Sequence, residues 1–244
     1  MAAQMQLFES QDNSERWTVR VSRRARRMSV RVYPGGRVEV VVPPGVPAAT
    51  VQRFVGSHTQ WIARRVEDLS AAGAVNDASP PSVIHVPAIG RSFTVVYEHT
   101  RSTSIRPELF DSRVLRVFGP VHDHEAIGTA LRQWLCDLAY DELGAQLGTV
   151  ARKHGFNYSR IQIRRQRTRW GSCSATGTIS LNACLMFLDP AVVRYLFIHE
   201  LCHTRHMNHS NRFWALVESH EPEYRRLDRE LLKGWQSVPG WMFE

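Results

Sequence analysis

The segment that most restricts the fold of this chain runs from residue 190 to residue 203. Asp189 is a good helix N-cap and Pro190 a good first helical residue, so a helix is predicted to begin here. Apolar side chains lie on all sides of this helix; they are Val192, Val193, Leu196, Phe197, Ile198 and Leu201. A helix that is apolar all round has to be buried. The rest of the chain must therefore supply elements that cover it.

Three polar side chains, in the segment His199-Glu200-Leu201-Cys202-His203, interrupt the apolar helix. Residues four apart lie nearly one above the other on a helix, so both imidazoles can reach one ion. Glu200 lies beside that ion without binding it, where it can take a proton from a zinc-bound water. The alternative is a pair of satisfied core histidines, but burying three such groups without a use is costly. We predict His199 and His203 as Zn²⁺ ligands and Glu200 as the catalytic base.

A third ligand would leave a tetrahedral zinc site with one open position. His209 is the preferred candidate, because its separation from His203 in the sequence matches that in H-E-x-x-H-x-x-G-x-x-H sites. The glycine of that pattern is replaced here by His206, a residue type that tolerates left-handed backbone better than most. Glu218 and Glu221 remain the competing third ligands.

The N-terminal part of the chain has the pattern of a small sheet with one helix. Apolar and polar side chains alternate between residues 17 and 42, and Pro34-Gly35-Gly36 predicts a hairpin turn, with a further strand before the hairpin. Pro47 then begins a predicted helix of about twenty residues. Residues 71–82 are small, polar and rich in proline, as is typical of a linker.

Further strands and helices follow this linker. Strands are predicted at 83–86, 92–98, 114–118 and 161–164, with 178–181 as the hairpin partner of the last, and helices at 125–154, 211–220 and 223–235. The fold class is α+β, with a β-rich N-terminal region that includes a helix, followed by a C-terminal half built around the active-site helix. As domains we expect a flexible tail at 1–15, the N-terminal region at 16–120 and a metallohydrolase domain at 121–244.

Composition restricts the setting in which such a protein works. The first fifteen residues lack the apolar stretch of a secretory signal, and no apolar run is long enough to span a membrane. The four cysteines show no C-x-x-C spacing, which argues against a disulfide framework or a cysteine zinc site. We expect a cytoplasmic protein with no membrane partner.

The formal net charge of +8 favours an anionic partner, and arginines gather in two clusters. The clusters are Arg23, Arg24, Arg26 and Arg27, and then Arg160, Arg164, Arg165, Arg167 and Arg169. The first suits a nucleic-acid backbone and the second a phosphate or an acidic peptide near the metal, although a solvated strand face explains either. No motif of a nucleic-acid-binding module supports a nucleic-acid partner.

Arg169 and Trp170, just before the predicted last strand, are candidates for substrate binding. Arg169 can bind an anionic group or stabilise a developing oxyanion. In the structural alternative, Trp170 covers the core and Arg169 pairs with a carboxylate such as Asp189. Both alternatives stay open at this point.

Three segments resemble the YgjP-like family of minimal zinc metallopeptidase domains, which is itself similar to the SprT-like proteases. They are RWGSCSATGTISLN at 169–182, HELCH at 199–203 and NHSNRFW at 208–214, and SRRARRMSVRVYPGGRVEVVVPPGV at 22–46 resembles the opening β-region of that family. The resemblance covers nearly the whole chain beyond the tail. It implies a zincin-like C-terminal half, with His199, His203 and His209 as zinc ligands and Glu200 as the base.

The predicted function is therefore zinc-dependent hydrolysis. The preferred form is a metallopeptidase in which Glu200 activates a zinc-bound water that attacks a peptide or protein substrate. One alternative is a metal-dependent nucleotide pyrophosphatase, a label that some members of the family carry and in which arginines would hold the nucleotide. Another is a basic binding protein with a structural zinc. Four protein ligands would favour that last function, and an open position would favour catalysis.

Overall fold

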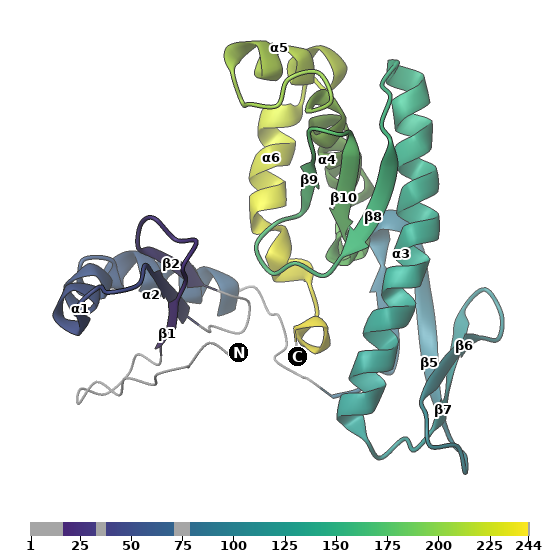
Figure 1. Ribbon diagram of the computed structural model, residues 1–244. Helices are drawn as coiled ribbons and strands as arrows, with labels where there is room; N and C mark the ends of the chain where they lie inside the picture. The colour runs from purple at the N-terminus through teal and green to yellow at the C-terminus, as the bar shows by residue number, and fades with distance from the viewer. Residues whose placement is uncertain (1–16, 33–37, 71–78, 244) are drawn as a thin grey trace. The chain divides into compact units, whose positions relative to one another are not determined.

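The computed structural model describes residues 17–32, 38–70 and 79–243, and these form two compact units, 1–76 and 77–244 (Figure 1). The expected tail at 1–15, the turn at 34–36 and most of the expected linker lie outside the described residues. The structure has helices and mixed sheets, so the predicted α+β class is confirmed. No helix in these ranges is both long enough and apolar enough to cross a membrane.

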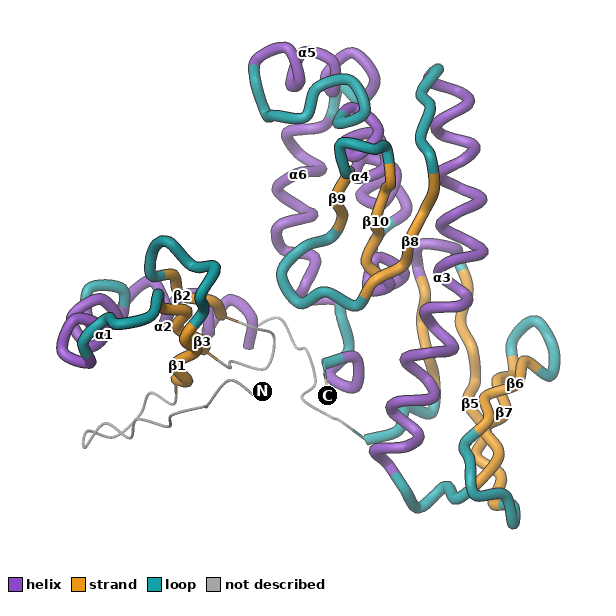
Figure 2. The backbone as a smooth tube through the Cα atoms, in the orientation of Figure 1, coloured by secondary structure: helices purple, strands orange, loops and turns teal. Residues whose placement is uncertain are grey.

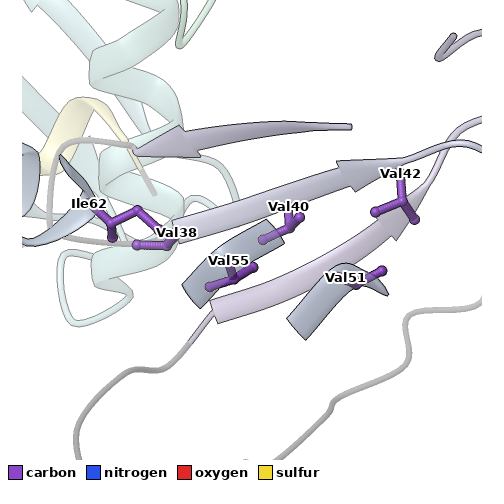
Figure 3. Packing of buried hydrophobic residues seen from close by; sticks show 6 residues of the cluster. All are labelled: Val38, Val40, Val42, Val51, Val55 and Ile62. Atoms are coloured by element: carbon purple, nitrogen blue, oxygen red, sulfur yellow. The ribbon is translucent and has the colours of Figure 1, made fainter. Parts of the chain in front are cut away.

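The first unit holds a three-stranded sheet of β1 (Trp17–Val21), β2 (Ser29–Val32) and β3 (Val38–Val42), in the order β1-β3-β2. β2 and β3 pair antiparallel, which confirms the predicted hairpin, and β1 pairs parallel to β3. The buried valines of β3 form a core with side chains from the two helices that follow; Figure 3 shows Val38, Val40, Val42, Val51, Val55 and Ile62.

The prediction of a single helix after Pro47 is wrong, because the structure has two helices, α1 (Ala48–Gly56) and α2 (Thr59–Ser70). The Phe54 carbonyl would accept the backbone N–H of His58 in a continuous helix. It is bonded instead to the Ser57 hydroxyl at 2.8 Å and to Nδ1 of His58 at 2.7 Å, while the His58 N–H donates to Val55. These local side-chain bonds compete with the helix and end it.

The second unit begins with a four-stranded sheet in the order β4-β5-β7-β6. Its strands are β4 (Val83–Val86), β5 (Arg91–His99), β6 (Arg106–Leu109) and β7 (Val114–Gly119). Three of them were predicted. β6 was missed because Pro107 argues against a strand, although a proline is tolerated on an edge strand such as this one. This sheet belongs to the same unit as the helix that contains His199 and Glu200, whereas the prediction from the sequence grouped it with the N-terminal region.

A long helix, α3 (His124–His154), lies along β8 of a second sheet (Figure 1). That sheet consists of β8 (Arg160–Arg164), β9 (Gly171–Cys173) and β10 (Thr178–Asn182), in the order β8-β10-β9. β10 runs parallel to β8 and antiparallel to β9, so the predicted hairpin of β8 with β10 is wrong. The hairpin partner of β10 is β9, which is too short to show a pattern in the sequence.

The centre of the second unit is α4 (Pro190–Cys202), which contacts β9, α3, α5 (Asn211–His220) and α6 (Tyr224–Lys233) (Figure 2). The carboxylate of Asp189 accepts the Ala191 N–H at 2.7 Å, as an N-cap residue does. The predicted buried helix is therefore confirmed. Short 3₁₀ turns complete the unit; they are Pro87–Ile89, Ala183–Phe187, Gly234–Ser237 and Gly240–Met242.

Candidate metal centre

Three histidine side chains meet beyond the last turn of α4. His199 and His203 come from the end of that helix and its cap, and His209 from the loop before α5. Nε2 of His199 lies 3.1 Å from Nε2 of His209, and one ring nitrogen from each of the three residues lies within 4.8 Å of the others. Ligand nitrogens of a tetrahedral zinc ion stand about 3.3 Å apart, given bonds of about 2.0–2.1 Å. The three imidazoles therefore fit a single metal ion.

Aromatic side chains of α5 hold the three imidazoles in place. The Phe213 ring is fully buried and lies 4.4–5.0 Å, centroid to centroid, from the rings of His199, His203 and His209. Trp214 stacks on His209 with an interplanar angle of 29°. His209 is itself exposed, so these contacts fix its direction toward the other two histidines.

The loop after α4 also orients His203. Nδ1 of His203 lies 3.0 Å from the carbonyl oxygen of His206, to which it can donate, and this leaves Nε2 free for an ion. The backbone N–H of His206 donates in turn to the Cys202 carbonyl at 3.0 Å. His206 thus contributes its backbone carbonyl and N–H at the position where the H-E-x-x-H-x-x-G-x-x-H pattern has glycine.

The competing third ligands, Glu218 and Glu221, form ion pairs with arginines. Glu221 is buried and forms an ion pair with Arg194, and Glu218 forms one with Arg225 at 3.3 Å. The metal-competent group found in the described part of the chain contains His209 and neither glutamate.

Burial favours the neutral, metal-binding form of the histidines. It is the main cause that lowers the pKa of His199 to about 3, with the neighbouring His203 and His209 adding to it. Burial also lowers the pKa of His203. Since a metal ion competes with protons for the imidazole nitrogens, a lowered pKa removes that competition at neutral pH.

Glu200 is only 4% exposed and packs against the backbone of β9. A Cβ atom on Gly171 would lie 2.6 Å from Oε1 of Glu200, so a larger residue here would force the Glu200 side chain to shift. Oε2 of Glu200 is buried and has no hydrogen-bond partner among the described residues. Burial raises the pKa of Glu200 to about 8, while the Arg169 guanidinium opposes that shift. A buried carboxyl with a bare oxygen is costly in a core that has no use for it.

The two residues predicted to bind substrate differ in their surroundings. Trp170 is buried and stacks on Trp235, with ring centroids 4.0 Å apart, which favours the structural alternative for its side chain. Arg169 is exposed, and its charge acts on Glu200. Asp189 caps α4, so it serves a purpose other than pairing with Arg169.

A buried asparagine fixes the backbone that leads to Arg169. Nδ2 of Asn182 donates to the carbonyl oxygens of Gln166 and Arg169, at 2.5 and 2.8 Å, and its own N–H donates to Trp170. This loop therefore places Arg169 and Gly171 beside α4.

Three other arginines of the second cluster make contacts of their own. Arg160 bonds Thr178, Arg164 bonds Gln162, and Arg167 donates to the Phe243 carbonyl. The first cluster lies between β1 and β2, in the first unit, and its four side chains are exposed. Of the second cluster, Arg169 acts on Glu200 through its charge.

Two residues of the site were missed in the sequence. Gly171 shows no spacing relation to Glu200, which it contacts across the fold. Asp228 lies on α6, 33 positions after Tyr195, whose hydroxyl donates to its Oδ1 at 2.7 Å. Neither contact follows a helical or strand period, so no sequence pattern could have revealed it.

Comparison with solved structures finds four matching chains, among them two metallopeptidase zymogens. The metallopeptidase zymogen abylysin of Pyrococcus abyssi is 24% identical over 40% of this chain and 98% of its own, with a TM-score of 0.36. The zymogen jannalysin of Methanocaldococcus jannaschii is 21% identical over 37% of this chain and 93% of its own, with a TM-score of 0.33. A search of curated proteins finds no match.

A family model gives the broader match. The model of the YgjP-like metallopeptidase domain matches residues 26–233, which extends across both units and includes the three histidines and Glu200. This confirms the resemblance seen in the sequence motifs. The chain belongs to the YgjP-like metallopeptidase family.

Proposed function

We propose that this protein is a zinc peptidase in which His199, His203 and His209 hold one Zn²⁺ and Glu200 is the general base. The observation that carries the proposal is the convergence of three imidazoles beside a buried glutamate with a bare oxygen. Membership of a metallopeptidase family supports a peptide or protein as the substrate class.

The donor set suits zinc. Imidazole nitrogens are preferred by zinc over hard cations such as Mg²⁺ and Ca²⁺, which take oxygen ligands. When bound, zinc supplies Lewis acidity, which polarises a carbonyl and makes a coordinated water more acidic. The group in the described residues has three protein ligands, and three ligands with an open fourth position are typical of catalytic sites rather than structural ones.

Glu200 is the group that we propose to move a proton. It follows His199 on α4, and contact with Gly171 restricts where its carboxyl group can go. Its unpartnered Oε2 can accept a proton from the attacking water and later give it to the leaving amine, as a general base and then acid. Removal of this carboxylate should stop turnover without removing a ligand.

Arg169 is the arginine proposed to act on substrate. It is exposed, yet close enough to Glu200 for its charge to lower the pKa of that carboxyl group. A cation there helps to keep the base ionised and can also bind an acidic group on the substrate. Arg160, Arg164 and Arg167 of the same cluster bond other groups, which argues against a nucleotide whose phosphates they would hold.

The decisive experiment compares wild type with Glu200→Gln, a change that keeps the shape and removes the proton acceptor. We expect the variant to retain one zinc per chain, measured by mass spectrometry of the metal, and to lose at least two orders of magnitude in kcat on a peptide library. Asp141→Asn, an exposed change on α3, is the matched control. Undiminished turnover in Glu200→Gln would remove Glu200 from the mechanism.

A further inference from the structure

A buried tyrosine and an aspartate lie behind His199, on the side away from the other two histidines. Tyr195 is one turn earlier on α4, is fully buried, and has its hydroxyl 3.5 Å from Nδ1 of His199. The same hydroxyl donates to Oδ1 of Asp228 on α6 at 2.7 Å. Asp228, which lies outside the metal site, thus sets the direction of the Tyr195 hydroxyl.

The direction of these hydrogen bonds decides the protonation pattern of His199. A tyrosine hydroxyl has one proton, and Tyr195 donates it in a hydrogen bond to the carboxylate of Asp228. The oxygen of Tyr195 is then left as an acceptor, which favours the tautomer of His199 with its proton on Nδ1. Nε2, which points toward Nε2 of His209, carries the lone pair.

The burial of Tyr195 also excludes it from direct chemistry. Its ring has no exposed surface, and the only hydroxyl proton is engaged with Asp228. Donation of this proton to a substrate therefore has no geometric support.

We propose that Asp228 and Tyr195 are positioning residues that act through His199, in a relay from carboxylate to hydroxyl to imidazole. The relay rests on the proposed metal centre, because it presents the lone pair of Nε2 to the ion and fixes the ring. It also couples α6 to the metal site, although α6 supplies no ligand. Residues that hydrogen-bond to a metal ligand in this way commonly contribute about ten- to a hundred-fold in metal affinity.

The test has two readouts on the full-length protein. Zinc affinity is measured by competition with a chromophoric chelator for wild type, Tyr195→Phe and Asp228→Asn. We expect about ten- to a hundred-fold weaker binding for Tyr195→Phe. Asp228→Asn should lose less, because the amide oxygen can still accept the tyrosine proton. Tyr140→Phe and Asp141→Asn, exposed on α3, are the matched controls and should bind zinc like wild type.

The second readout needs no metal and separates positioning from mere packing. In the metal-free protein labelled with ¹⁵N-histidine, His199 should be the neutral Nδ1–H tautomer in wild type and a mixture of tautomers in Tyr195→Phe. If wild type bound no zinc, the proposed function would fail. The tautomer of His199 in the metal-free protein would still show whether Tyr195 and Asp228 orient this histidine. Wild-type zinc affinity in Tyr195→Phe, with an unchanged His199 tautomer, would overturn the relay.

Discussion

The contact between Gly171 and Glu200 makes a sharp prediction, because one methyl group in β9 should disable a base on α4. In Gly171→Ala the new Cβ would lie 2.6 Å from Oε1 of Glu200 and 3.0 Å from both its Cδ and its Cγ. Ordinary van der Waals contact begins at 3.4 Å, so the carboxyl group must shift by about 0.8 Å or more. It cannot shift freely, since Glu200 is buried.

The size of the effect follows from that displacement. Misplacing a catalytic group by about 1 Å costs on the order of a hundred-fold in rate. Overpacking costs roughly 1–3 kcal/mol, which lowers the Tm of a unit this size by roughly 2–12 °C. We therefore expect Gly171→Ala to stay folded and keep its metal while kcat/KM on a peptide falls about a hundred-fold.

The assay measures kcat/KM, bound metal and Tm on the same preparation. Gly144→Ala is the control: its Cβ would meet only Ile161 Cδ1, at 3.8 Å, and alanine in a helix should stabilise by roughly 0.5–1 kcal/mol. If Gly171→Ala were as active as Gly144→Ala, the close packing of Glu200 against β9 would not matter for catalysis.

Three other changes test the third ligand, the arginine that acts on Glu200 and a buried ion pair. His209→Ala should weaken zinc binding by more than about a hundred-fold by chelator competition, with Glu218→Ala unaffected; the reverse result would exchange the third ligand. Arg169→Gln removes the positive charge that lowers the pKa of Glu200, so the acid limb of the kcat/KM profile should move to higher pH, and an unmoved limb would refute that coupling. Arg194→Met leaves Glu221 buried without its ion pair and should cost roughly 1–3 kcal/mol in urea unfolding; an unchanged midpoint would show that the pair contributes nothing.

The parts of the fold that depend on neighbours in sequence could be predicted. The Asp189 cap, the apolar surround of α4 and the four-residue spacing of His199 and His203 are local features, and a helix converts them directly into geometry. The same holds for the antiparallel hairpin of β2 and β3.

The parts that depend on distant partners could not. β10 pairs with both β8 and β9, and a strand pattern carries no information about which neighbour is parallel. The break between α1 and α2 depends on which donor reaches the Phe54 carbonyl, a competition between bonds of similar strength. The roles of Gly171 and Asp228 appear only once α4 is packed against β9 and α6.

X-ray absorption at the zinc edge of the purified wild-type protein tests the metal centre most directly. The three-histidine site predicts a first shell of three imidazole nitrogens and one further light atom, all at about 2.0–2.1 Å. A sulfur scatterer at about 2.3 Å, or fewer than three imidazoles, would contradict His199, His203 and His209 as the ligand set.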